Sequence, residues 1–175
     1  SFQAIKLKEG DSVVGIEEEK KEVTLLLVTE KGMCLNADMS DIPVQGRIAG
    51  GVKAIQLNDG DAVLAAMQVS EDGEAVLITD KSNAKRIPVG GIEPMARYRK
   101  GFKIFDLKAN TGSRIIFASY VTNPYTIVLD VDDEYLSQFD TEDLPVQNST
   151  NSGKPLVRGC TGLEKVYVYK TEADE

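Results

Sequence analysis

Hydrophobic positions along the chain fall into short runs that are separated by polar turns. Between residues 51 and 100, apolar side chains cluster at 52–57, 63–67, 75–78 and 84–87, with turn residues such as Asn58-Asp59-Gly60-Asp61 between them. Runs of this length that are bounded by Gly, Asp and Asn predict β-strands. The continuous apolar run at 75–78 is typical of a strand buried on both faces. No segment has the periodicity of an amphipathic helix.

The same pattern occurs in the first 50 residues, displaced by 50 positions without a gap. Residues 1–14 align with 51–64, and Thr29-Glu30-Lys31-Gly32 aligns with Thr79-Asp80-Lys81-Ser82. A third, less faithful copy follows at an offset of 52, with a polar insertion at 148–155 that reads as a loop. Periods of about 20 to 50 residues are typical of solenoids, propellers and arrays.

We therefore predict an all-β fold of propeller-like blades, each of about four strands. The chain would be a single domain, 1–175, with three full repeats at about 8–57, 58–107 and 108–170 plus the closing strand of a fourth. Because residues 1–7 match only the end of a repeat, we expect the chain to be part of something longer. Residues 171–175 form an acidic tail. A β-solenoid is the alternative fold, but its repeats are usually shorter.

Composition narrows the possible functions. A hydrophobic content of 42% and a charged content of 27% are those of a soluble globular protein. The chain has no histidine, and its two cysteines, Cys34 and Cys160, make neither a disulfide framework nor a metal site. No stretch is long and apolar enough to span a membrane, and no signal peptide opens the chain. We expect a cytoplasmic protein without catalytic residues, metal or cofactor in this segment.

Charge is distributed unevenly. The net charge is -8, yet the stretch from Asp80 to Lys103 contains seven cations and only two acids. In a blade arrangement these cations could share one rim and bind a nucleic acid. Solvated charged loops are the alternative interpretation. With three further basic residues of the repeats and one from the insertion, the candidate DNA-binding residues are Arg47, Lys53, Lys81, Lys85, Arg86, Arg97, Arg99, Lys100, Lys103, Lys154 and Arg158.

One arginine recurs with the repeat. Arg47, Arg97 and Arg158 each stand four residues before a glycine that precedes an apolar run. A periodic arginine could contact successive phosphates along a duplex without reading its sequence. It could equally hydrogen-bond loop carbonyls in every blade, and the sequence leaves both interpretations open.

The segment from Gly46 to Asp61, preceded by Thr29-Glu30-Lys31-Gly32, resembles a known repeat. It is similar to that of the C-terminal domain of the A subunit of bacterial type IIA topoisomerases, DNA gyrase and topoisomerase IV. The resemblance implies a β-pinwheel in which neighbouring blades exchange a strand. Gln45–Gly51 matches the gyrase signature only in part, lacking one arginine and the lysine. This departure favours topoisomerase IV or a divergent gyrase.

The resemblance also implies a function and partners. The domain would bind double-stranded DNA along a basic outer rim and bend or wrap it, while the whole enzyme changes DNA topology at the expense of ATP. Its partners would be the rest of the topoisomerase A subunit and the ATPase subunit, in the bacterial cytoplasm near the nucleoid and without a membrane. The alternative hypothesis, favoured by the acidic balance, is a β-repeat scaffold that binds another protein.

Overall fold

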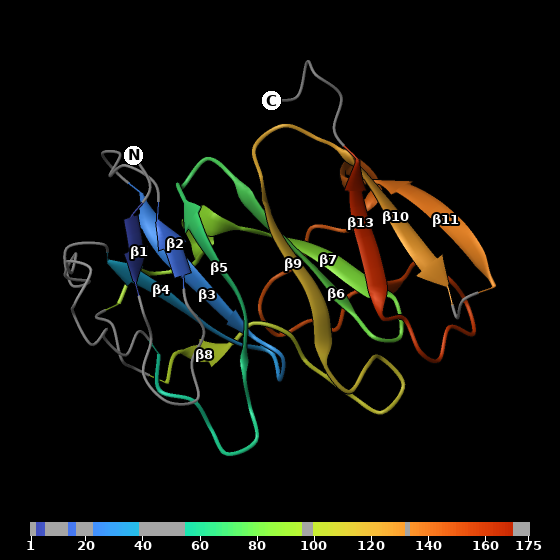
Figure 1. The fold of residues 1–175 in the computed structure, drawn as a ribbon, viewed down its shortest axis with the longest axis horizontal. Helices are drawn as coiled ribbons and strands as arrows, with labels where there is room; N and C mark the ends of the chain where they lie inside the picture. The colour runs from blue at the N-terminus through green and yellow to red at the C-terminus, as the bar shows by residue number, and fades with distance from the viewer. Residues whose placement is uncertain are drawn as a thin grey trace.

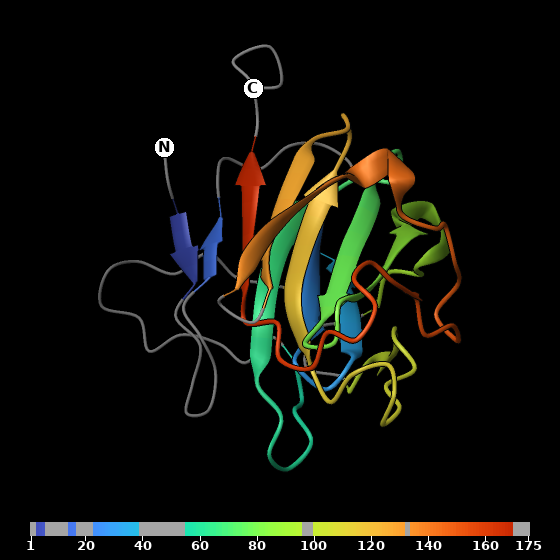
Figure 2. The same cartoon turned by 90° about the vertical axis from the view of Figure 1, so that its right-hand side faces the viewer.

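In a computed structural model of the chain, residues 23–38, 55–95, 100–131 and 134–169 are described in full, as is the backbone of 3–5 and 14–16. All regular elements of the described residues are β-strands, apart from two short 3-10 helices. The strands form three antiparallel sheets and one two-stranded pair, β1 (Gln3–Ile5) with β2 (Val14–Ile16). Figure 1 shows the three sheets side by side, and Figure 2 shows them stacked one behind another.

Each sheet has a defined strand order. The first is β5-β3-β4-β8, made of Val63–Val69, Thr24–Thr29, Met33–Asp38 and Phe102–Lys103. The second is β12-β7-β6-β9, made of Lys154–Pro155, Asn83–Pro88, Glu74–Thr79 and Ile115–Val121. The third is β11-β10-β13, made of Tyr135–Asp140, Thr126–Val131 and Lys165–Tyr169. The all-β prediction is therefore confirmed.

The four strands of a sheet come from successive copies of the repeat. In the first sheet, β3 and β4 form the hairpin of the first copy, and β5 and β8 both come from the second copy. The second sheet has the same plan one copy further along, with β9 against β6 and β12 against β7. A repeat is therefore not equivalent to a sheet, because each copy contributes strands to its neighbours.

The central hairpins form where the sequence repeats most faithfully. In each, the threonine before the turn accepts a backbone N–H from beyond it: Met33 N–H donates to Thr29 Oγ1 at 3.0 Å, and Asn83 N–H donates to Thr79 Oγ1 at 3.2 Å. The turn also needs a left-handed residue, which is Gly32 (φ 85°) in one copy and Ser82 (φ 63°) in the next. The shared Thr-x-Lys-x turn thus specifies the same hairpin twice.

The hydrophobic core lies between the sheets. Apolar side chains of β3 and β4 meet those of β6 between the first and second sheets, and the opposite face of β6 meets β10 between the second and third. Ala75 and Leu77 point to one of these layers and Val76 and Ile78 to the other, all with no exposed surface. The prediction that 75–78 is buried on both faces is confirmed.

Three sequence-based expectations need correction. The predicted strand at 52–57 lies partly outside the described residues, and Ile55–Leu57 is not a strand, although Ile55 is buried against Leu25 and Leu35. The loop after residue 87 contains a 3-10 helix, η2 (Val89–Gly91). The insertion at 148–155 is not wholly a loop, because its last two residues form β12.

Candidate nucleic-acid interface

The outermost strands of the first two sheets, β8 and β12, begin in the same way. Each follows a glycine in the left-handed region, Gly101 with φ 72° and Gly153 with φ 73°. A Cβ on Gly101 would lie 1.9 Å from the carbonyl oxygen of Cys34, and one on Gly153 would lie 2.8 Å from that of Ala84. Cys34 and Ala84 are 50 residues apart. The two glycines therefore occupy equivalent places and let each outer strand approach the sheet closely.

This equivalence corrects the interpretation of the recurring arginine. Gly101 corresponds in space to Gly153 and not to Gly162, the glycine that follows Arg158 in the sequence pattern. Arg158 is exposed in the loop that leads to β13, so it does not continue the series. Arg47 and Arg97, like Lys53 and Arg99, lie outside the described residues.

Exposed lysines accompany both outer strands. Lys100 and Lys103 flank Gly101, and Lys154 directly follows Gly153; all three are exposed. We call them the edge lysines. Within the described residues, none of the three is in an ion pair, whereas Arg86, Lys108 and Arg114 are paired with Glu74, Asp106 and Glu30. The charges of the edge lysines are thus available to a polyanion.

Lys85, which we predicted to contact DNA, is instead fully buried. Its ammonium donates to the carbonyl oxygens of Asn148 at 2.8 Å and Asn151 at 3.0 Å, and lies 4.8 Å from the centre of the Phe105 ring. Burial lowers the pKa of Lys85 to about 8, and the neighbouring Cys34 and Asp106 partly offset this. The side chain fastens the 148–151 segment to the second sheet and has no exposed surface with which to meet a ligand.

Arg86 and Lys81 are also engaged within the protein. The Arg86 guanidinium contacts the Glu74 carboxylate at 2.9 Å and donates to the carbonyl oxygens of Leu144 and Glu142 at 3.0 and 3.2 Å. The Lys81 ammonium donates to the carbonyl oxygen of Ala109. Lys81 keeps part of its surface exposed, whereas Arg86 has few free donors left.

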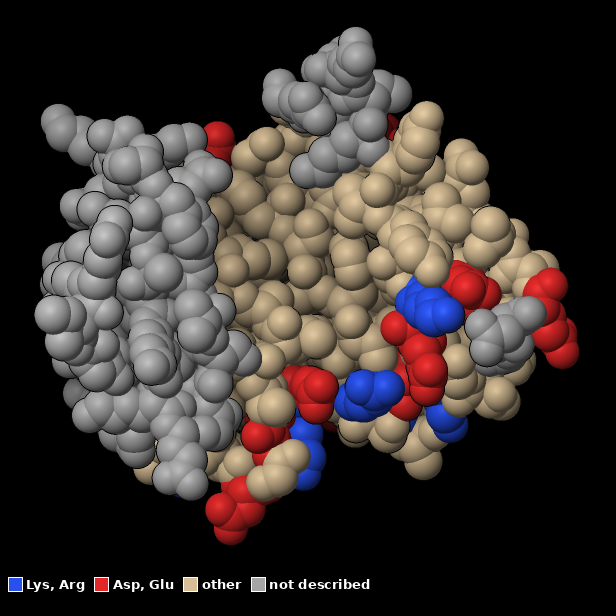
Figure 3. All heavy atoms as spheres, in the orientation of Figure 1, with Lys and Arg blue, Asp and Glu red and all other residues tan. Residues whose placement is uncertain are grey.

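Other cations were not singled out from the sequence. Lys31, Lys108, Arg114 and Lys165 are exposed but lie outside the Asp80–Lys103 cluster. Lys31 also recurs with the repeat, because Lys81 stands 50 residues after it. Figure 3 shows a broad uncharged field at the centre of the face on which β5, β9 and β13 lie, with basic and acidic residues alternating along its lower border. The described residues on this side therefore form no continuous basic surface.

The described residues offer no alternative reactive site. They contain no group of three or more Cys, Asp or Glu side chains placed to hold a metal ion. Burial raises the pKa of the Cys34 thiol to about 12, so it stays protonated and is a poor nucleophile. None of the helices in this part of the chain has the length and apolar character required to cross a membrane.

Comparison with known proteins places the chain in a family context. The family described as "DNA gyrase C-terminal domain, beta-propeller" matches residues 3–17, 24–70 and 73–121, which is more than half of the chain. No curated protein sequence matches the chain. The Gln3–Val121 region therefore carries the sequence evidence for the family.

Solved structures resemble the fold over nearly the whole chain. The C-terminal domain of DNA topoisomerase IV has a TM-score of 0.79 at 26% identity over 94% of this chain and 52% of that one. The DNA gyrase A C-terminal domain has a TM-score of 0.75 at 17% identity, covering 95% and 57%. The E. coli ParC C-terminal domain has a TM-score of 0.70 at 16% identity, covering 95% and 69%. The chain thus spans about half the length of the first two.

Proposed function

Because the chain belongs to the family of DNA gyrase C-terminal β-propeller domains, we propose that it binds double-stranded DNA and bends or wraps it for a type IIA topoisomerase. The observation that carries the proposal is the presence of exposed lysines at equivalent outer strands of two successive sheets, with no ion pair among the residues that the structure describes. Cations spaced along successive sheets suit a polyanion whose phosphates follow a regular track.

The proposed DNA-binding residues differ in how well they are supported. Among the described residues, the edge lysines, Arg158 and Lys81 retain exposed surface. Arg47, Lys53, Arg97 and Arg99 remain in the proposal on the strength of the sequence repeat alone. Lys85 is omitted because it is buried, and Arg86 because its guanidinium is already satisfied.

The wider arrangement is part of the same proposal. The sheets would be blades of a β-pinwheel with three full repeats, at about 8–57, 58–107 and 108–170, and the closing strand of a fourth. The chain would act with the remainder of a topoisomerase A subunit and its ATPase subunit, in the bacterial cytoplasm near the nucleoid. The match to the gyrase family model and the similarity at 26% identity to a topoisomerase IV domain keep both enzymes in the proposal.

Reversing the edge lysines tests the DNA-binding surface. We expect the triple variant Lys100→Glu, Lys103→Glu and Lys154→Glu to lower affinity for a duplex by tenfold or more. The salt dependence should also weaken, by about 0.9 in the slope of log K against log salt for each phosphate contact removed. Fluorescence anisotropy with a labelled duplex at several salt concentrations measures both quantities.

A charge-matched control separates position from net charge. Lys108→Glu, Arg114→Glu and Lys165→Glu change the net charge by the same amount at exposed sites outside β8 and β12. This control should lose less than about threefold in affinity if contacts, rather than the overall field, carry binding. Equal losses in the two triple variants would refute the edge-lysine surface, and absence of binding by the wild-type chain at low salt would refute DNA binding itself.

A protein-binding scaffold is the second candidate, and one observation favours it. Tyr135 and Leu136 on β11 and Tyr167, Val168 and Tyr169 on β13 are exposed, between 43% and 67% of their full surface. Exposed apolar side chains gathered on one sheet mark interaction surfaces. If the wild-type chain fails to bind DNA, this third sheet becomes the surface to investigate.

A further inference from the structure

A cavity of about 260 Å³ opens at the end of the first sheet. Its walls are Thr24 of β3, Asn36 of β4, Glu71 before β6, and the η2 segment that continues to Pro94. Its volume is several times the ~30 Å³ that a water molecule takes up in the liquid. The cavity can therefore hold an organic group, and Val89 supplies an apolar part of its wall.

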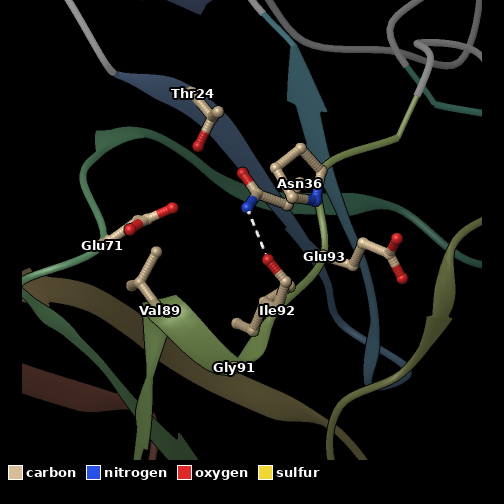
Figure 4. A pocket seen from close by; sticks show the side chains of 9 residues that line it. Thr24, Asn36, Glu71, Val89, Gly91, Ile92 and Glu93 are labelled. Atoms are coloured by element: carbon tan, nitrogen blue, oxygen red, sulfur yellow. Dashed lines mark hydrogen bonds between the residues drawn. The ribbon is translucent and has the colours of Figure 1, made fainter.

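The side chain of Asn36 points into this cavity and its amide oxygen lacks a hydrogen-bond donor among the described residues. The residue is only 2% exposed, and its amide Nδ2 donates to the carbonyl oxygen of Ile92 at 3.0 Å. Its Oδ1 atom has no hydrogen-bond partner in the part of the chain that the structure describes. Figure 4 shows this oxygen on the open side of the amide, away from Ile92. A buried amide oxygen left unsatisfied is costly, so a donor from outside would bind here favourably.

The side chains of Thr24 and Glu71 add further acceptor oxygens, of which the Thr24 hydroxyl can also donate. In Figure 4 the Thr24 hydroxyl and the Glu71 carboxylate turn toward the same space as Asn36, whereas the Glu93 side chain turns away. One carboxylate with two neutral oxygens falls short of the six to eight ligands that Ca²⁺ takes. The three groups together suit a cation that carries several N–H donors.

The second sheet contains such a cation at the equivalent place. Arg86 stands 50 residues after Asn36, and the backbone carbonyls of both accept a hydrogen bond from the following loop, from Met95 N–H at 2.7 Å and from Gln147 N–H at 2.9 Å. The side chains also correspond. Asn36 Nδ2 donates to Ile92 O after η2, and Arg86 Nε donates to Leu144 O after η3 (Thr141–Asp143), each at 3.0 Å.

The residue that pairs with Arg86 also differs between the two sheets. Glu74, which contacts Arg86 at 2.9 Å, stands 50 residues after Thr24. A guanidinium therefore fills this position in the second sheet, where the first sheet has the shorter Asn36 and a cavity. The second sheet thus shows that this position accommodates a guanidinium group.

We propose that the cavity of the first sheet binds a guanidinium group from another molecule, in the place that Arg86 fills in the second sheet. Its N–H groups would donate to Asn36 Oδ1, Thr24 Oγ1 and the Glu71 carboxylate. The group could belong to an arginine side chain of a protein segment or to a small free guanidinium compound. This inference is independent of DNA binding, because it uses none of the edge lysines.

Titration with L-argininamide tests the proposal. The side-chain amide NMR signals of Asn36 should shift saturably with argininamide and much less with lysinamide, which has a similar charge but no planar fork of donors. A short glycine-flanked arginine peptide distinguishes the two sources: tighter binding than argininamide indicates a protein segment, and equal binding indicates a free compound.

Three variants identify the site. Asn36→Arg, combined with Thr24→Glu, should fill the cavity from within and abolish binding, which is followed in this variant by the backbone amide signals of Gly90 and Gly91. Glu71→Gln should weaken binding by about tenfold, the effect of losing one charged hydrogen bond. Glu93→Gln should leave it unchanged. The proposal is overturned if argininamide produces no saturable shift of Asn36, if lysinamide binds equally well, or if Glu71→Gln and Glu93→Gln behave alike.

Discussion

Replacing Gly101 by alanine is expected to destabilise the fold by about 3–5 kcal/mol, one of the two largest effects expected of a single substitution in this chain. Gly101 has φ 72°, and an added Cβ would lie 1.9 Å from the carbonyl oxygen of Cys34. That oxygen is backbone in the buried strand β4, so it cannot turn aside as a flexible side chain would. The outer strand β8 would have to separate from β4.

Gly159 provides the matched control. It has a similar φ of 76°, but a Cβ there would meet nothing within 4 Å. Gly159→Ala should therefore show only the left-handed backbone penalty, about 1–2 kcal/mol. Urea unfolding of both variants and the wild type gives the comparison through the midpoint and slope. A Gly101→Ala cost within 1 kcal/mol of the Gly159→Ala cost would mean that the close approach of β8 is not required for stability.

Much of the fold could be predicted from the sequence because strands and turns leave local signals. The apolar run at 75–78 and the Thr-x-Lys-x turns identified the central hairpins, which the structure confirms. Two-residue strands such as β8 and β12 leave no such signal, because alternation needs more positions to be visible. Ile55 resembled a strand residue but is apolar because it packs against the first sheet outside any strand.

The exchange of strands between copies could not be predicted from the repeat, for a different reason. A repeat indicates which residues are equivalent, but it does not say which copies pair. Without the pairing, the polar insertion before Arg158 hid the fact that Gly153, not Gly162, corresponds to Gly101. Only the shared approach of the two glycines to Cys34 and Ala84 reveals the correspondence.

The candidate site was predicted less well, because a count of charges says nothing about burial. Lys85 and Lys103 contribute equally to the basic cluster, yet one is enclosed and the other is exposed. The ammonium of Lys85 donates to backbone carbonyls, and a pattern of side chains in the sequence does not predict such partners. The difference between Asn36 and Arg86, by contrast, was visible at the 50-residue offset, together with the change from Thr24 to Glu74.

Lys85→Ala is expected to cost about 3–5 kcal/mol, the second large effect. The substitution removes a fully buried side chain, which leaves a cavity beside Phe105. It also leaves the carbonyl oxygens of Asn148 and Asn151 without the ammonium that holds them. Lys85→Met keeps most of the buried volume and loses only the ammonium. It should therefore cost less, about 1–3 kcal/mol, when both variants are compared by urea unfolding at pH 7.

The lowered pKa of Lys85 also makes the stability of the fold depend on pH. Burial lowers the pKa of Lys85 from 10.5 to about 8, so between these values the unfolded chain holds a proton that the folded chain has released. Stability therefore rises with pH in this window, by at most about 1.4 kcal/mol per pH unit. Burial raises the pKa of Cys34 from 9.0 to about 12, so above pH 9 the folded chain retains a thiol proton that the unfolded chain loses. The titration of Cys34 therefore lowers the free energy of unfolding above pH 9, against the increase caused by Lys85. Between pH 8 and pH 9, only Lys85 of these two groups changes the stability.

The expected result is a free energy of unfolding that increases from pH 8 to pH 9 in the wild type but not in Lys85→Met. Urea midpoints at half-unit steps measure it, and the difference between the two proteins cancels the titration of all other groups. Adding Cys34→Ala should extend the rise beyond pH 9, because the opposing thiol is then absent. If the wild type and Lys85→Met keep parallel profiles, Lys85 titrates in the folded chain as it does in the unfolded one, and its ammonium is solvated rather than enclosed. In that case the 148–151 segment is not fastened to the second sheet, and Lys85 returns to the set of cations available to DNA.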